Sequence, residues 1–446
     1  MENAPTRPSG MFGFTVVWIG QIVSVLASSM SQFALTIFMF QETGSALAMG
    51  TMQVFFITPF LLISPVAGVW VDRYNRKMMM MVSDIAAGIA TLSILILQAM
   101  GILEYWHLYG ASIIYGLGMA FQWPAYSAAI STMVPKEQLG RANGMMSLIE
   151  AGPGVIAPFL AGALLPVIGL TGILVFDVVT FILAIGALMI VHVPQPVRTE
   201  EGARAQGGML KEAAYGFKYI FARPSLLGLQ LIFFVGNLFA GIAFTVVAPM
   251  ILSRSGGDSL MFGSAQSAGA IAGVVGGVLM SAWGGFKRRA HGVLFGWIIS
   301  GIGMAIIGFA GGLPVWITGM AITSIVIPLV NGSNQAIWQS KVAPDLQGRV
   351  FSARRLIAWL TNPISPILGG ALADFVLEPA ARAGTGLPST FAWLVGTGAG
   401  SGMGLLIVFC GLASAFVGLA GYFVSHIRNA ETILPDHDTL AKAQPA

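Results

Sequence analysis

The sequence is short of charge and has a single cysteine, and both shortages narrow the class of protein. Charged residues make up 9% of the 446 residues and hydrophobic residues 56%. A soluble domain carries about 25% charged residues, so this chain cannot build a water-facing surface. Cys410 has no cysteine to pair with, which excludes an intrachain disulfide. The five histidines are scattered and there is no phosphate-binding P-loop motif, so the sequence predicts no metal site, no cofactor and no enzyme.

Apolar runs of membrane length fill most of the chain, and the mean hydropathy is +0.82. A run of about 20 apolar residues spans the hydrocarbon core of a bilayer, and backbone groups in lipid must bond within the segment, which makes the segment a helix. A membrane β-barrel would need alternating segments of about 10 residues, whereas runs such as 226–252 are unbroken. We therefore predict an all-α membrane protein with twelve transmembrane helices, near 11–40, 47–71, 78–100, 108–131, 144–167, 170–192, 226–252, 260–283, 291–311, 313–335, 352–376 and 402–426.

The basic residues support this helix count. With the N-terminus inside, 20 of the 22 lysines and arginines fall in cytoplasmic segments, and only Arg254 and Arg382 fall outside. One missed helix would destroy this asymmetry, because positive residues collect on the cytoplasmic side. Both termini are therefore predicted to be cytoplasmic. The net charge of +4 is interpreted as a topology signal and not as a nucleic-acid surface.

The longest polar stretch, 194–225, divides the chain into two halves. Within it, residues 209–224 have the pattern of an amphipathic helix on the inner membrane surface. The predicted organisation is an N-terminal six-helix bundle (1–193), a cytoplasmic linker (194–225), and a C-terminal six-helix bundle with a short cytoplasmic tail (226–446).

The two halves also resemble each other in sequence. Arg141 and Pro158 recur as Arg349 and Pro366 at a constant offset of 208, and SALAMGTMQ parallels DSLMFGSAQ at an offset of 213. Two stretches in the same order indicate duplication of a six-helix unit. Parallel repeats of this kind are a transporter architecture, with the halves related by a pseudo-two-fold axis and the substrate path between them.

The loop between the second and third predicted helices carries a recognisable motif. GVWVDRYNRK, at 68–77, resembles the G-x-x-x-D-R-x-x-R-K signature of the major facilitator superfamily. The resemblance implies a conformational latch in which an acidic side chain pairs differently in different open states. Alternatively, the basic residues only fix the topology. The latch residues would be Gly68, Asp72, Arg73, Arg76 and Lys77.

Other stretches narrow the resemblance to one branch of that superfamily. QETGSALAMG, the 68–77 loop and AIWQSKVAPDLQGRVFSARR resemble the drug:proton antiporters that include bacterial macrolide-efflux proteins and the enterobactin exporter. The resemblance implies proton-driven efflux of a drug, macrolide or siderophore across the bacterial inner membrane. The implied partners are the lipid bilayer, a small amphipathic substrate and protons, and the implied state is a monomer. The direction of transport follows from the resemblance alone.

The fifth predicted helix is similar to the Gly-Pro-rich motif of proton-coupled antiporters, although Ala157 and Ala161 stand where glycine is usual. Proline removes backbone donors and small residues admit a neighbouring helix, so a kink and close packing are expected whatever the substrate. The kink and packing positions in the fifth and eleventh helices are Pro153, Pro158, Gly162, Pro366 and Gly370.

Ionisable groups within membrane helices are costly, so each one is a functional candidate. Glu150 and Asp177 lie about two turns inside their helices and are the candidates for proton coupling. Glu150 could instead pair with Arg141, and Asp177 could instead hold helices together. Asp84 and Asp374 are predicted nearer helix ends, where solvation or helix pairing is expected.

Uncharged polar residues in the spans are candidates for the substrate cavity. The first, fourth, seventh and tenth helices face the cavity in this superfamily, which selects Gln32, Gln122, Tyr126, Asn237 and Asn331. Each could instead make an interhelical hydrogen bond worth about 0.6 kcal/mol. A cavity with few charges and many Met, Phe and Trp side chains suits amphipathic compounds. A lipid or lysophospholipid translocator, or a non-transporting receptor on the same fold, remains an alternative.

Overall fold

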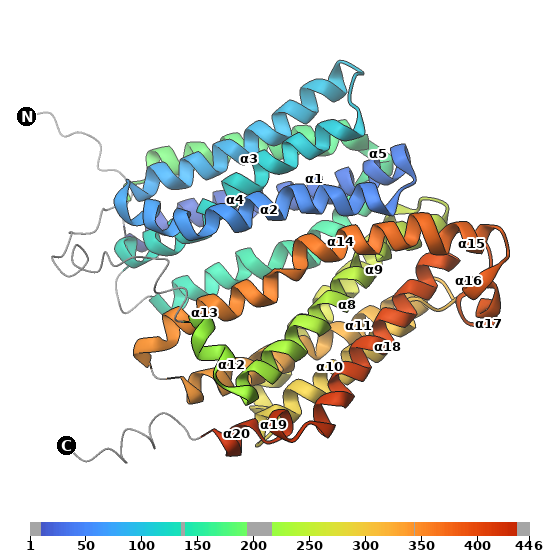
Figure 1. Ribbon diagram of the computed structural model, residues 1–446. Helices are drawn as coiled ribbons and strands as arrows, with labels where there is room; N and C mark the ends of the chain where they lie inside the picture. Colours follow the sequence, from blue (N-terminus) through green and yellow to red (C-terminus); the bar gives the residue numbers. More distant parts are fainter. Residues whose placement is uncertain (1–9, 135–138, 194–215, 343, 435–446) are drawn as a thin grey trace, which may run out of the picture. The chain divides into compact units, whose positions relative to one another are not determined.

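The computed structural model describes residues 10–134, 139–193, 216–342 and 344–434, and within these ranges the chain is helical and contains no strand (Figure 1). The chain divides into two compact units. Unit 1 comprises Met1–Val197 with Gly257–Ser267, and unit 2 comprises Arg198–Gly256 with Ala268–Ala446. Of the amphipathic helix predicted at 209–224, residues 216–221 are helical, and the part before 216 lies outside the described residues.

Unit 1 contains five long helices. They are α1 (Gly10–Thr43), α2 (Ala46–Arg73), α3 (Arg76–Ala99), α4 (Tyr105–Met133) and α5 (Leu139–Ile190). The side chains of Ser45 and Asn75 accept the backbone N–H groups of Ala48 and Met78 in the first turns of α2 and α3, which fixes where these helices begin. The backbone of α5 is non-helical at Gly169, with φ 67° and ψ 178°, a conformation open to glycine. This kink joins the two helices predicted at 144–167 and 170–192.

Unit 2 contains long helices and several short ones near its chain ends and turns. They are α8 (Pro224–Ser255), α9 (Ser259–Trp283), α10 (Arg289–Ile307), α11 (Leu313–Ile325), α12 (Ile327–Lys341), α13 (Pro344–Trp359), α14 (Thr361–Leu372), a π-helical turn η2 (Ala373–Leu377), α15 (Glu378–Arg382), α16 (Gly386–Thr390), α17 (Ala392–Val395), α18 (Ser401–Phe423), α19 (Ser425–Arg428) and α20 (Ala430–Ile433). The first residues of α9 group with unit 1.

Two predicted helices of unit 2 are each interrupted, and proline explains both interruptions. The helix predicted at 313–335 is divided into α11 and α12 at Val326, two residues before Pro328. The helix predicted at 352–376 is divided into α13 and α14 at Leu360, three residues before Pro363. Proline has no N–H to donate to the preceding turn and its ring clashes there, so the helix breaks.

Ten helical stretches among the described residues are long and apolar enough to cross a membrane. One of them, Gly152–Ile190, covers two predicted helices across the Gly169 kink. In addition, α4 lies between the third and fourth of these stretches. The described helices thus correspond in order to those predicted from hydropathy.

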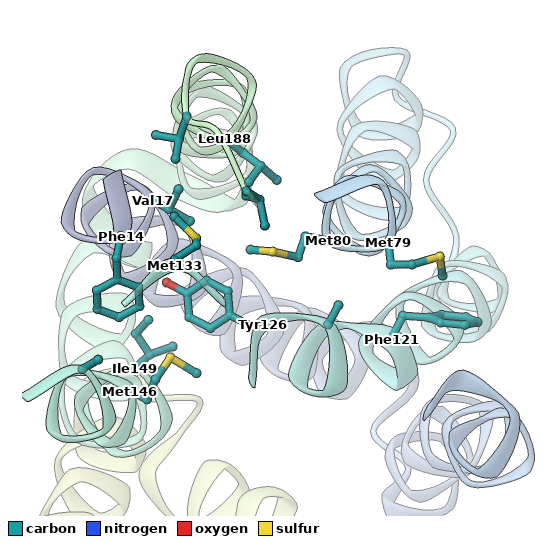
Figure 2. Packing of buried hydrophobic residues seen from close by; sticks show 14 of the residues in the cluster. Phe14, Val17, Met79, Met80, Phe121, Tyr126, Met133, Met146, Ile149 and Leu188 are labelled. Carbon is teal, nitrogen blue, oxygen red and sulfur yellow. The ribbon is translucent and has the colours of Figure 1, made fainter. Parts of the chain in front are cut away.

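The core of unit 1 forms where α3 packs on α4 and α5, and where α1 packs on α5 and α4. At the end of the unit where α1 and α3 begin, an apolar cluster fills the space between these helices (Figure 2). The labelled members of this apolar cluster are Phe14, Val17, Met79, Met80, Phe121, Tyr126, Met133, Met146, Ile149 and Leu188.

Candidate functional site

Asp84 is a buried carboxylate held by two neutral amides. It lies on α3 and is 7% exposed. Gln21 Nε2 on α1 donates to Asp84 Oδ2 at 2.7 Å, and Gln122 Nε2 on α4 donates to Oδ1 at 3.2 Å. Gln122 Nε2 also lies 3.4 Å from Gln21 Oε1. The three side chains, from three helices, form one connected polar group, called here the Asp84 layer.

Asp177 is a second buried carboxylate, and hydroxyl groups hold it. It lies on α5 and is 1% exposed. Ser28 Oγ on α1 donates to Asp177 Oδ1 at 2.8 Å, and Thr91 Oγ1 on α3 donates to Oδ2 at 3.0 Å. Tyr115 on α4 lines the same pocket as Asp177. These four residues are called here the Asp177 layer.

A small pocket connects the two layers. It has a volume of about 30 Å³, and its lining includes both Asp84 and Asp177, with Ser24 and Gly88 also contributing. A cavity needs on the order of 10–15 Å³ to hold one water, so this pocket has room for a few waters at most. Drug-sized ligands occupy roughly 300–1,000 Å³, so the pocket is suited to water and protons. The residues that line it include no lysine or arginine.

The two layers repeat with a spacing of seven residues on three helices. The pairs are Gln21 and Ser28 on α1, Asp84 and Thr91 on α3, and Gln122 and Tyr115 on α4. Seven residues are about two helical turns, or roughly 10 Å along the helix axis. The polar groups therefore lie on one face of each helix and form two levels in the interior of unit 1.

Glycines bring the helices around the pocket close together. A Cβ atom on Gly88 of α3 would lie 2.3 Å from Cζ of Phe181 on α5. A Cβ atom on Gly118 of α4 would lie 2.9 Å from the carbonyl oxygen of Ser83, whose hydroxyl donates to Gly118 O at 2.8 Å. Small residues allow this approach, as is common between membrane helices.

The predicted latch residues lie at the junction of α2 and α3. The surroundings of Gly68 and the side chains of Asp72 and Arg73 fall outside what the structure describes, and Arg76 is the first residue of α3. Lys77 Nζ donates to the carbonyl oxygens of Met189 and Val191, each at 2.8 Å. A lysine in this position satisfies free carbonyls at the end of α5.

The other predicted site residues are distributed over both units. Glu150 lies in α5, and its side chain is outside the described part. Gln122 belongs to the Asp84 layer, whereas Tyr126 is buried in the apolar cluster, with its ring 6.4 Å from that of Phe14 (Figure 2). The remaining cavity candidates are two half-buried residues, Gln32 and Asn237, and one exposed residue, Asn331.

The kink and packing positions are all buried. Pro153 and Pro158 lie inside α5. The carbonyl oxygen of Gly162, also in α5, accepts a hydrogen bond of 2.9 Å from the hydroxyl group of Ser259, which belongs to the segment 257–267 that groups with unit 1. Pro366 and Gly370 lie in α14, which packs on α8.

Sequence reasoning missed part of this site. Gln21, Ser28, Thr91 and Tyr115 were not singled out, because isolated polar residues are common in membrane helices. Asp84 was expected to be solvated or to pair helices near a helix end, and the structure buries it between α1 and α4. The seven-residue spacing of polar residues in three predicted helices is a signal that could have located the site.

Buried ionisable groups inside a bundle of membrane-length helices are typical of ion and substrate pathways, and they define a class of protein, the polytopic membrane transporter. The comparisons with known proteins agree with this class. The chain belongs to the Major Facilitator Superfamily, whose family model matches residues 17–366. It is a multi-pass membrane transporter and not an enzyme.

Several relatives of this chain are efflux proteins. The chain is 27% identical to macrolide efflux protein A of Streptococcus pyogenes, over 81% of this chain and 89% of that protein. It is 24% identical to the multidrug efflux pump Tap of Mycolicibacterium fortuitum, over 75% of this chain and 82% of that protein. These relatives are consistent with the predicted membership in the branch of drug antiporters.

Solved structures show the same fold. A bacterial homologue of the human lysosomal transporter Spinster aligns with a TM-score of 0.66 at 18% identity, over 92% of this chain and 97% of that chain. A bacterial homologue of the iron transporter ferroportin aligns with a TM-score of 0.66 at 15% identity, over 92% and 98%. The predicted fold class, an all-α membrane protein of two helical bundles, is confirmed.

Proposed function

We propose that this chain exports small amphipathic compounds from the bacterial cytoplasm in exchange for protons, by alternating access of its two bundles. The efflux proteins among its relatives support the direction and the kind of substrate. The low charge content supports a cavity that binds its substrate mainly by apolar contact. In this proposal the chain is a monomer in the inner membrane with both termini in the cytoplasm.

The proposed proton coupling rests on the surroundings of Asp177. Its side chain is almost completely buried, and the hydroxyl groups of Ser28 and Thr91 donate to its carboxylate. A hydroxyl can donate to a carboxylate and can also accept from a protonated carboxyl group after rotating. Asp177 can therefore gain or lose a proton while Ser28 and Thr91 remain hydrogen-bonded to it, which an ion pair with a lysine or arginine would not allow.

Other residues have assigned roles in this proposal. Glu150, on α5, is a second proton-coupling residue. The segment from Gly68 to Lys77 acts as the conformational latch, in which Lys77 holds the end of α5. The cavity residues Gln32, Gln122, Asn237 and Asn331 contact the substrate, together with Tyr126.

The proposal is tested by dye accumulation in bacteria that lack their main efflux pumps. Cells that express the protein are loaded with a fluorescent lipophilic dye, with and without a protonophore, alongside cells with the Asp177→Asn variant. We expect expression to lower accumulation, and we expect both the protonophore and Asp177→Asn to restore the level of cells without the protein. Glu104→Gln, which changes an exposed carboxylate of unit 1 in the same way, serves as the control and should behave as wild type.

A different result would redirect the proposal. If expression lowers the accumulation of dye equally with and without protonophore, protons do not drive the export. If no dye is exported but labelled lysophospholipid crosses vesicle membranes that contain the protein, the lipid translocator replaces the drug exporter.

A further inference from the structure

We propose that Asp84 and Asp177 act together as a two-step proton relay inside unit 1, with water in the pocket between them carrying the proton. The inference rests on the proposed proton coupling and adds Asp84 as a further carrier that exchanges protons with Asp177. It is carried by three observations: both carboxylates line one pocket, their partners repeat on three helices, and one end of the site is packed with apolar side chains.

The spacing of the layers requires water between the two carboxyl groups. The layers are about 10 Å apart along the helix axes, whereas a direct O–H···O hydrogen bond spans about 2.5–3.0 Å. A chain of two waters connected by such bonds covers roughly 8 Å, and the two side chains can cover the remainder. The pocket of about 30 Å³ has room for waters of this number.

The same spacing excludes one metal ion shared by both carboxylates. A cation held by oxygen ligands lies about 2.5 Å from each of them, so it cannot touch two carboxylates in layers about 10 Å apart. The hydrogen-bonding partners are hydroxyls and amides, which can serve as donors or acceptors. These groups suit carboxyl groups that alternate between the protonated and the ionised form.

The transfer is balanced in atoms and charge. As the O–H bond on one carboxyl group breaks, the first pocket water accepts that proton and passes one of its own to the second water. The second water then passes one of its own protons to the other carboxylate, so both waters end as neutral H2O. One O–H bond forms for each that breaks, and no electrons are exchanged with a cofactor.

Asp84 is faced by Gln21 of α1 and by Gln122 and Tyr126 of α4. Asp177 is faced by Ser28 of α1, Thr91 of α3 and Tyr115 of α4.

The apolar cluster lies one helical turn beyond the Asp84 layer. Val17, Met80 and Tyr126 are each four residues from Gln21, Asp84 and Gln122 on the respective helices, and all three belong to the cluster (Figure 2). Packed apolar side chains exclude water. Proton exchange between Asp84 and the solution at that end therefore requires the cluster to open, whereas exchange between Asp84 and Asp177 does not.

Ser24 offers a variant that blocks the path and leaves both carboxylates in place. Ser24 lies on α1, three residues after Gln21 and four before Ser28, and it lines the pocket. Residues at these spacings share one helix face, so its side chain lies between the two layers. Ser24→Leu would fill the pocket with carbon, and Ser24→Ala, which removes the hydroxyl without filling the space, is the matched control.

The experiment uses the full-length protein in proteoliposomes. Transport of the dye that is exported in cells is measured against its gradient with an imposed pH difference, and down its gradient at equal pH. The variants are Asp84→Asn, Asp177→Asn, the double variant, Ser24→Leu and Ser24→Ala. We expect Asp84→Asn and Ser24→Leu to reduce uphill transport on the order of 100-fold, as for loss of a positioned proton-transfer group, and to change downhill transport little.

Because the two carboxylates act as one unit, the double variant should be no more impaired than either single variant. Infrared difference spectra of the purified protein on acidification give a separate readout. We expect a carboxyl C=O band that loses intensity in Asp84→Asn and again in Asp177→Asn. Ser24→Leu should keep both contributions, because it changes neither carboxylate.

The outcomes separate this inference from the proposed function. If Asp84→Asn and Ser24→Leu both transport uphill like wild type while Asp177→Asn does not, the relay is wrong and proton coupling through Asp177 stands. If a sodium gradient at equal pH drives uphill transport and a pH difference does not, both are wrong. If Asp84→Asn fails to fold, the pair of Ser24 variants still decides, because loss of uphill transport in Ser24→Leu alone supports the relay and activity in both overturns it.

Discussion

Unit 1 and unit 2 both bury ionisable side chains, but they give them different partners. In unit 1, Asp84 and Asp177 are bonded to amide and hydroxyl side chains around a pocket. In unit 2, Glu378 Oε1 accepts the backbone N–H of Gly400 at 2.7 Å, and Lys341 Nζ donates to the carbonyl oxygens of Glu431 and Leu434 at 2.6 and 2.5 Å.

Arg254 in unit 2 is also bonded to backbone groups, as Lys341 is. Its guanidinium group donates to the backbone carbonyls of Gly308, Phe309 and Val395, at 2.7–3.2 Å. A backbone carbonyl only accepts and a backbone N–H only donates, so such partners favour one fixed protonation state. These charges hold turns and chain ends in place. Burial alone therefore does not identify a proton carrier, and the chemistry of the partners is the better guide.

The largest effect on stability is expected from removing a buried charge of unit 2. Lys341 is 8% exposed and holds the short helix α20 through two carbonyls. Lys341→Met removes both charge-assisted bonds and leaves two part-buried carbonyl oxygens without this donor, which costs about 3 kcal/mol. We expect a clearly lower melting temperature of the purified protein in detergent, followed by tryptophan fluorescence.

The control for this prediction is Lys287→Met, which changes an exposed lysine of unit 2 and should leave the melting temperature unchanged. Each folded Lys341→Met molecule should still transport dye uphill. An unchanged melting temperature together with lost uphill transport would contradict the structural role of Lys341 in holding α20. It would also weaken the contrast between the units.

An intermediate effect is expected from adding a methyl group beside the pocket of unit 1. In Gly88→Ala the new Cβ would lie 2.3 Å from the ring of Phe181, so the ring must move or the helices must separate. Overpacking of this kind costs about 1–3 kcal/mol. The melting temperature of Gly88→Ala should fall, and Phe181→Leu in the same chain should restore part of it.

Gly186 on α5 provides the matched glycine, because nothing lies within 4 Å of a Cβ atom built there. Gly186→Ala should be neutral or stabilising by up to about 1 kcal/mol, since alanine favours the helix. If both alanine variants are equally stable, the close packing around the pocket is looser than the contacts indicate.

The sequence predicted the helices well because hydropathy over about 20 residues reports burial in lipid directly. It also singled out Asp177, a lone carboxylate deep in an apolar run. It could not show that Asp84 faces Gln21 and Gln122, because that depends on the rotation and axial offset of α3 relative to α1 and α4. The predicted helix at 78–100 also places Asp84 closer to a helix end than the structure does, since α3 begins at Arg76 and Asp84 lies about 12 Å along it.

The smallest effect is expected for Glu378, and it is the sharpest test of the comparison. Glu378 is 4% exposed, and its ion pair with Arg382 has an Oε1 to Nε distance of 3.6 Å, with the Arg382 side chain 65% exposed. Glu378→Gln keeps an oxygen that can accept from Gly400, and the ion pair with Arg382 that it loses is open to solvent and worth less than about 1 kcal/mol. It also removes a charge that acts on Arg254, so we expect a small loss of stability and unchanged uphill transport in proteoliposomes. Loss of uphill transport with retained downhill transport would place a proton carrier in unit 2, because the variant removes a titratable group and keeps the acceptor for its backbone partner. The distinction between the two units that is drawn from the chemistry of the hydrogen-bond partners would then be wrong.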